Sequence, residues 1–279
     1  MTGRAAAHRM RADEIGRYLL VVSLALVVLA PLAIMLATSL KTQRQTFETG
    51  FSFFFVPTLD NYREILEGRF LGYLGNSVIV GLVSTALTLL LGTMCAYALS
   101  RFRFVGRGPL ATSTLLLRTV PPAVLAVPVY FIWHRVGLGD GLGGLILVYV
   151  ALNLPFTIWL LYGFIEQVPI ELEEAATVDG CGPFRLFFML ILPLVKPGLA
   201  AAGIFTFRIA WNELVLASVL TNRSTRTLPY AIYLFITDAG IEWGKLMAAG
   251  VLIAVPPLVF TFMAARQLIA GLTAGAVKG

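Results

Sequence analysis

Long apolar stretches separated by short polar ones run along the whole chain. Each of six stretches holds the roughly 20 mostly apolar residues that a helix needs to cross a lipid bilayer. They fall at residues 18–40, within 71–100, at about 109–133, within 141–165, at about 198–220 and at 246–265. Because the stretches are continuously apolar and do not alternate, they favour helices over a β-barrel. The pattern predicts an all-α membrane protein with six transmembrane helices.

Composition and charge fit this reading. The chain is 58% hydrophobic and only 13% charged, whereas soluble domains carry about 25% charged residues. The net charge of +6 comes from basic residues at the ends of apolar stretches, without interleaved aromatic residues, so it does not indicate nucleic-acid binding. The first stretch is longer than the apolar region of a signal peptide, about 7–15 residues, and we expect it to remain as a span.

Short basic segments set the predicted orientation. Arg101, Arg103 and Arg107 lie in one tight turn, and four further arginines precede the first span. Lys and Arg in short loops are retained on the cytoplasmic side. We therefore expect both termini in the cytoplasm, with a cytoplasmic N-terminal segment 1–17, a single six-helix transmembrane domain 18–270 and a cytoplasmic tail 271–279.

The segment at about 166–190, between the fourth and fifth spans, is polar and would be cytoplasmic. Pro169 suits a helix start, acidic residues follow in the first turns, and Gly180 suits a left-handed cap before Pro183. This predicts a short helix over residues 170–179, with two small alanines that let another surface approach closely. Because so short a helix is marginal in water, packing against a partner would stabilise it. An ordinary connector between spans is the alternative.

The spacing in this segment resembles a known motif. Glu174-Ala175-Ala176, three residues, Gly180, nine residues, Leu190, one residue and Leu192-Pro193 resemble the EAA motif of permease subunits from ABC importers, with Leu190 in place of the usual isoleucine. Further segments resemble the carbohydrate branch of that family. These are Asn76-Ser77, residues 96–102, Val120-Pro121-Pro122-Ala123, Trp211-Asn212-Glu213 and Arg226-Thr227-Leu228-Pro229. The tail 271–279 is similar to the end of maltose-type permeases.

The resemblance implies a sugar-transport function, a set of partners and a place in the cell. The predicted helix would be the coupling helix, which sits in a cleft of a cytoplasmic ATPase; its contact residues would be Leu172, Glu174, Ala175, Ala176, Asp179 and Gly180. The tail, with Thr273, Lys278 and Gly279, would reach the ATPase interface. The expected partners are a second homologous permease, two ATPase subunits that bind ATP and Mg, an extracytoplasmic substrate-binding protein and the lipid bilayer. The expected location is a bacterial or archaeal cell membrane.

Polar side chains inside the spans are candidates for the translocation path. They are Arg118, Asn153, Arg208, Trp211, Asn212 and Glu213. An ionisable group in the membrane is costly unless it is paired or faces water, so it is a functional candidate. The alternative is that these groups hold helices or subunits together, and Glu213 could pair with Arg118. In maltose-type importers most substrate contacts come from the other permease subunit.

The sequence lacks the motifs of an enzyme. It contains no phosphate-binding Gly-x-x-x-x-Gly-Lys-Ser/Thr loop, no metal-ligand spacing around His8 or His134, and no Ser/His/Asp arrangement. We therefore expect no cofactor or metal in this chain, with ATP bound by a partner. The alternatives are an ABC permease for another polar solute, of the polyol or glycerol-phosphate type, and an ion-driven secondary transporter. The latter would show internal repeats, which are absent. A membrane-embedded enzyme would need a catalytic group of residues that the chain does not supply.

Overall fold

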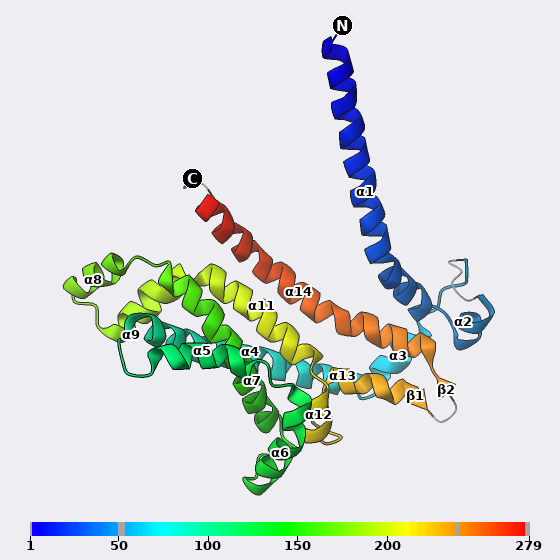
Figure 1. Cartoon of the computed structure of the whole chain (residues 1–279). Helices are drawn as coiled ribbons and strands as arrows, with labels where there is room; N and C mark the ends of the chain where they lie inside the picture. The colour runs from blue at the N-terminus through cyan, green and yellow to red at the C-terminus, as the bar shows by residue number, and fades with distance from the viewer. Residues whose placement is uncertain (1, 50–53, 238–239, 277–279) are drawn as a thin grey trace. The chain divides into compact units, whose positions relative to one another are not determined.

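The structure is a computed structural model that describes residues 2–49, 54–237 and 240–276 (Figure 1). The chain divides into two compact units, one formed by Met1–Gly68 with Leu234–Leu252, the other by Arg69–Tyr233 with Ile253–Gly279. The described backbone is mainly helical, which confirms the predicted class. Its two strands, β1 (Ile236–Thr237) and β2 (Gly240–Ile241), form a small antiparallel hairpin that the sequence analysis did not anticipate.

The first unit begins with α1 (Thr2–Ser39) and includes α2 (Gln43–Thr49), α3 (Asp60–Glu67) and the start of α14 (Trp243–Ala276). The apolar part of α1, Glu14–Ser39, is long enough to span a membrane and has no buried share, as expected for a surface whose solvent is lipid. Polar contacts secure α3. Asn61 donates hydrogen bonds to the carbonyls of Ser39 and Lys41, and the ammonium of Lys245 lies 2.7 Å from the Glu64 carboxylate.

Three long helices form the core of the second unit: α4 (Phe70–Arg101), α7 (Leu142–Glu166) and α11 (Lys196–Asn212). Each packs against the other two. The approach of α4 to α7 is close, since a Cβ added at Gly92 would lie 2.7 Å from Cγ2 of Thr157. The hydroxyl of Thr157 is 3.2 Å from that of Thr206 on α11. Small residues and interhelical hydroxyl contacts of this kind are typical of helix packing in membranes.

The third predicted span is not one helix. The chain forms α5 (Arg107–Leu117) and α6 (Pro122–Arg135), with residues 118–121 between them. Pro121 is extended, with φ −66° and ψ 137°. The two prolines explain the break, because a residue before proline avoids the helical region and proline donates no backbone hydrogen bond. A continuous helix over residues 109–133 was therefore the wrong expectation.

The fifth predicted span is also divided. Helix α11 ends at Asn212, Glu213 has ψ 122°, and α12 (Val215–Leu220) follows. On the other side, α9 (Pro183–Leu186), the π-helix η1 (Phe187–Ile191) and α10 (Leu192–Leu194) form a helical arm that meets α11 at a bend of 77°. The bend falls at Val195, just before Lys196-Pro197, where proline removes a backbone donor.

The remaining elements are short, and the span count stays open. They are α8 (Ile170–Val178), α13 (Leu228–Ala231) and the 3₁₀ helix η2 (Ile232–Phe235). Within the described residues, four helices are long and apolar enough to cross a membrane, or five if the bent arm and α11 count as one span. Six spans and cytoplasmic termini remain predictions.

Candidate functional site

Helix α8 forms where the short cytoplasmic helix was expected and ends one residue earlier, at Val178. Gly180 has φ +82°, a conformation that favours glycine. Its N–H donates to the carbonyl of Thr177 at 3.0 Å, and the N–H of Cys181 donates to that of Ala176 at 2.9 Å. Together these two bonds make a Schellman cap. The end of the helix is therefore defined by the glycine of the EAA-like motif.

The two sides of α8 differ in exposure. Ala176 and Cys181 pack against an apolar cluster that contains buried Leu161, Ile165 and Leu186. The exposed residues are Ile170, Glu171, Leu172, Glu174, Ala175, Thr177, Val178, Asp179 and Gly180. Five of the six predicted ATPase-contact residues are thus on open surface, whereas Ala176 is partly covered by the cluster beneath the helix.

A buried ion pair joins α8 to the end of α4. Nε of Arg101 lies 2.6 Å from the Glu173 carboxylate, and the two side chains are only 11% and 10% exposed. The hydroxyl of Tyr97 donates to the other carboxylate oxygen of Glu173 at 2.8 Å. Arg101 also donates to the carbonyls of Ile165 at 3.0 Å and Val168 at 2.7 Å. This pair was not predicted from the sequence, where Arg101 entered through the topology and the segment 96–102 and Glu173 as a first-turn acid, because two opposite charges 72 residues apart carry no local signal.

More polar contacts surround this pair. Ser100 donates its hydroxyl to the Glu166 carboxylate at 2.6 Å. Arg107, the first residue of α5, donates to the hydroxyl of Tyr162 at 3.1 Å and lies 3.6 Å from Glu166. These contacts join the ends of α4, α5 and α7 to one another, and Arg101 and Tyr97 of α4 join this group to α8.

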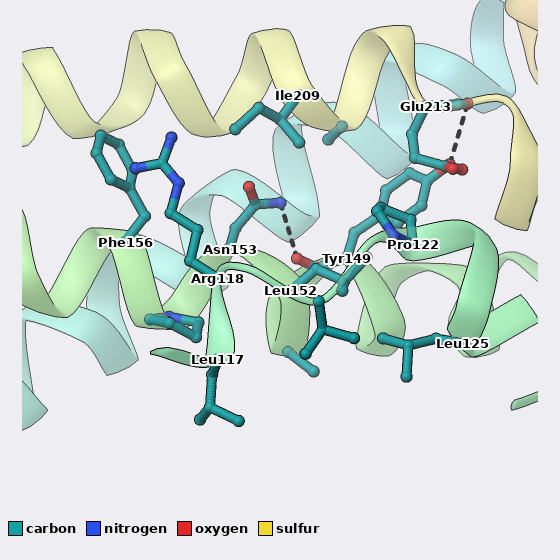
Figure 2. Close-up of a pocket in the computed structure, with 14 residues that line it drawn as sticks. Leu117, Arg118, Pro122, Leu125, Tyr149, Leu152, Asn153, Phe156, Ile209 and Glu213 are labelled. Carbon is teal, nitrogen blue, oxygen red and sulfur yellow. Dashed lines mark hydrogen bonds between the residues drawn. The ribbon is translucent and has the colours of Figure 1, made fainter. Parts of the chain in front are cut away.

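A separate cavity of about 350 Å³ lies between the α5–α6 break, α7 and α11 (Figure 2). Its walls are mainly apolar, with a few polar groups, which is the usual composition of a small-molecule site. The lining residues that carry polar side chains are Arg118, Tyr149, Asn153 and Glu213. Three of the six predicted path residues therefore meet in one place.

Arg118 and Asn153 present polar groups to this cavity. The guanidinium carbon of Arg118 lies 4.1 Å from the centre of the Phe156 ring, within cation–π range. No carboxylate of the described residues lies within ion-pair distance of it. Asn153 is 2% exposed, and its amide nitrogen donates to the carbonyl of Tyr149 at 2.8 Å. Figure 2 shows its amide oxygen directed away from that bond, on the side of Arg118 and Ile209.

Glu213 has a different role from the one considered in the sequence analysis. Its carboxylate accepts hydrogen bonds from the N–H groups of Leu216 and Ala217 at 3.0 and 3.2 Å, and from the hydroxyl of Tyr149 at 2.9 Å. It therefore caps α12, and the proposed pair with Arg118 is not formed. The reason is local: the break after Asn212 exposes backbone donors that a nearby carboxylate satisfies.

The other predicted residues lie elsewhere. Arg208 and Asn212 are exposed and do not line the cavity. Trp211 is 1% exposed, stacks on Phe207 at 5.4 Å and donates to the carbonyl of Ile253, so it is a packing residue. Lys278 and Gly279 lie outside the described residues, and Thr273 lies in α14 with no description of its side chain. No group of three or more potential metal ligands occurs in the described part of the chain.

Comparison with known proteins identifies the family. Residues 88–272 match the family described as binding-protein-dependent transport system inner membrane component. The chain is 40% identical over 226 residues to the trehalose transport system permease protein SugB of Mycobacterium tuberculosis, covering 80% of this chain and 82% of the relative. It is 38% identical over 224 residues to the diacetylchitobiose uptake system permease protein DasC of Streptomyces coelicolor, covering 80% and 81% of the two chains.

A solved structure has the same fold. It belongs to a bacterial ABC transporter involved in the import of the acidic polysaccharide alginate. The TM-score is 0.75 at 20% sequence identity, covering 92% of this chain and 96% of the other.

The chain belongs to the family of binding-protein-dependent transport system inner membrane components. This membership confirms the ABC importer permease inferred from the EAA-like spacing. It also confirms that the chain is a transport component and not an enzyme, and it decides against an ion-driven secondary transporter.

Proposed function

We propose that this chain is the permease subunit of an ATP-driven importer that moves a carbohydrate across a bacterial or archaeal cell membrane. Two of the similar proteins are permeases of a trehalose transport system and a diacetylchitobiose uptake system, and the structural neighbour is a transporter involved in alginate import. These names support a saccharide as the solute. A polyol or a glycerol-phosphate-type solute is the alternative within the same class.

The complete importer would contain several chains. A second homologous permease would complete the membrane path, an extracytoplasmic binding protein would deliver the solute, and two ATPase subunits would bind ATP and Mg in the cytoplasm. Both termini of this permease would be cytoplasmic, with residues 18–270 forming the membrane domain. The tail 271–279, with Thr273, Lys278 and Gly279, would reach the ATPase interface.

The observation that carries the proposal is the way α8 is exposed on one side and bound to the protein on the other. Its outer side offers an apolar and acidic surface, with Leu172, Glu174 and the small Ala175 exposed, while its buried Glu173 is bound by Arg101 and Tyr97 of α4. A helix exposed on one side and anchored on the other can receive a push from a soluble partner and pass it to the spans. Docking in a cleft of the ATPase would let ATP-driven closure move α8, and with it the membrane core.

The cavity beside Arg118 is the proposed part of the translocation path. Helix α5 has 11 residues and rises about 16 Å, roughly half of the 30 Å hydrocarbon core. With the turn before α5 at the proposed cytoplasmic surface, Arg118, which follows α5, would lie near the middle of the bilayer. Broken helices near the midplane form solute sites in many transporters. Arg118 supplies donors, Asn153 supplies an acceptor, and both suit the hydroxyls of a sugar.

The remaining predicted path residues fit the surface between subunits better. Arg208 and Asn212 are exposed on α11 outside the cavity, and we place them against the second permease. Trp211 keeps a packing role next to Phe207.

The first test is affinity purification of this chain from its native membrane in a mild detergent, with identification of the co-purifying proteins. Recovery of an ATPase, a second permease and a binding protein is the expected result. The binding protein then serves to screen mono- and oligosaccharides, polyols and glycerol phosphates. Recovery of the chain alone, with uptake driven by an ion gradient and insensitive to ATP, would refute the proposal.

A further inference from the structure

We propose that Arg101 is a positioning residue that fixes α8 rigidly to the membrane core, so that movement of α8 is transmitted to α4 and α7. This inference rests on the proposed function, since it assumes that a partner pushes α8. It concerns a residue outside the EAA-like segment.

The hydrogen bonds of one guanidinium carry the argument. Nε of Arg101 binds Glu173 on α8, and Nη2 donates to Ile165 near the end of α7 and to Val168 in the linker. The last carbonyls of a helix have no partner within it, and a cation there is favourable. The planar fork of arginine therefore satisfies α7, the linker and α8 together, which the point charge of a lysine could not do.

Glu173 is held from two positions on α4. One carboxylate oxygen accepts from Arg101 and the other from Tyr97, one helical turn earlier. Residues four apart lie on the same face of a helix, so Tyr97 and Arg101 of α4 both donate to the Glu173 carboxylate from one side. Since both charged side chains are about nine-tenths buried, loss of either partner leaves the other charge uncompensated.

The linker between α7 and α8 is short and could otherwise act as a hinge. It comprises residues 167–169, and its backbone is held by turn bonds from Gln167 to Phe164 and from Val168 to Ile165. Without the Arg101–Glu173 pair, α8 would keep these turn bonds and the apolar contact of Ala176. A push on α8 would then rotate α8 about the linker. With the pair intact, the same push displaces the ends of α4 and α7.

The attachment is tested on this chain alone, by hydrogen–deuterium exchange in lipid nanodiscs. Arg101→Gln and Glu173→Gln should each raise amide exchange in α8 by about tenfold or more, while exchange in the centres of α4 and α7 stays unchanged. Arg103→Gln and Glu171→Gln are matched controls, because both residues are exposed neighbours of the pair. The controls should change exchange less than twofold. Unchanged exchange of α8 in both test variants would overturn the proposal.

The transmission is tested in the assembled importer without knowledge of the solute. Leu125 lines the cavity, and Leu125→Cys in a background with Cys95→Ala and Cys181→Ala reports cavity opening through the rate of maleimide labelling. MgATP should change this rate in the parent. In Arg101→Gln the change should be lost while ATP hydrolysis continues, and Arg101→Lys should retain part of it. A full response to MgATP in Arg101→Gln would show that Arg101 has no positioning role.

The two experiments separate the failure of this inference from that of the proposed function. If the parent recruits no ATPase and shows no response to MgATP, the proposed function fails, and with it the transmission of force by Arg101. The exchange experiment still decides whether Arg101 fixes α8. If Arg101→Gln does not fold, Glu173→Gln and Arg101→Lys supply the same comparison with smaller perturbations.

Discussion

Two arginines at helix ends in the second unit show two different uses of the same side chain. Arg101 is the last residue of α4, is mostly buried and has a carboxylate and two backbone carbonyls as acceptors. Arg118 follows α5, lines a cavity and rests on the ring of Phe156, with no carboxylate of the described residues in ion-pair range. The charge of Arg101 interacts only with groups of the described protein. Arg118 leaves its donors available to a ligand.

This difference shows that the polar side chains of the two regions are used in different ways. At the base of α8 they join helices, because Arg101 binds a carboxylate of α8 and two backbone carbonyls of α7 and the linker. In the cavity they are few, and the proposed role as a solute site would require this, because a solute must bind weakly enough to leave again. Substitutions at the two ends should therefore affect different measurements.

The largest expected effect is on stability, with Arg101 compared against Arg118. Arg101→Gln removes one partner of a buried pair and should lower the free energy of unfolding by about 3 kcal/mol. Arg118→Gln should change it by less than about 1 kcal/mol, because no buried charge loses its partner. Thermal unfolding of the purified chains in one detergent measures both. Equal losses of stability in the two variants would mean that Arg101 and Arg118 contribute to folding in the same way.

The second prediction extends the coupling end of the comparison to Gly180. Gly180→Val places a β-branched residue at φ +82°, which strains the cap and should lower transport about tenfold or more while the protein still inserts. Solute uptake in vesicles, normalised to membrane content, measures it. Gly182→Ala is the matched control, since Gly182 has φ −70° and a Cβ added there would meet no atom within 4 Å. Normal uptake by Gly180→Val would contradict the role of this loop in coupling.

The third prediction concerns the cavity. Arg118→Gln should raise the apparent KM for the transported solute about tenfold, because a charge-assisted hydrogen bond is lost. Recruitment of the ATPase and its basal hydrolysis should stay unchanged. The control is Arg208→Ala, which should reduce recovery of the second permease without changing KM. An unchanged KM in Arg118→Gln, or a changed solute preference in Arg208→Ala with normal assembly, would reverse the two assignments.

A smaller effect is expected at the outer side of α8. Glu174→Lys reverses an exposed charge and should reduce the yield of ATPase in a pull-down several-fold, with no change in the thermal stability of the isolated chain. The same substitution at the buried Glu173 should destabilise the isolated chain itself. If Glu174→Lys leaves the yield unchanged, the exposed side of α8 is not the docking surface.

The smallest effect belongs to Glu213. Glu213→Gln keeps an acceptor near the start of α12 but removes the negative charge that favours this helix end, at a cost of about 1 kcal/mol. Thermal unfolding measures the loss, and KM should remain near that of the parent. A KM shift as large as that of Arg118→Gln would place Glu213 in contact with the solute.

Local signals in the sequence predicted the bounds of α8 closely. They predicted the breaks in the third and fifth spans poorly. Pro169 and Gly180 mark the two ends of α8, because each acts on the backbone within one turn. The splits after Leu117 and Asn212 were not predicted. For the first, the apolar run was long enough to predict a single span although it contains Pro121-Pro122. The break after Asn212 contains no proline, and Glu213 alone did not predict that its carboxylate would cap a new helix at Leu216 and Ala217.

Long-range pairing was the other limit. The cavity residues Arg118, Asn153 and Glu213 were identified one by one as polar groups in apolar stretches, yet their partners could not be assigned. Arg118 rests on Phe156 and Glu213 binds Tyr149, contacts that depend on how α7 is placed. The Arg101–Glu173 pair was not predicted either, because it also depends on how distant helices pack.

The tight contact at Gly92 has a consequence for how this sequence can change. Apolar side chains in the exposed part of α1, Glu14–Ser39, should be exchangeable for other apolar ones with little effect, but a methyl group at residue 92 would collide with Thr157. Accommodating it would require a simultaneous reduction at residue 157, where the hydroxyl also meets α11. In a library of random substitutions, tolerated changes at residue 92 would therefore be rare and would arrive together with a second change on α7.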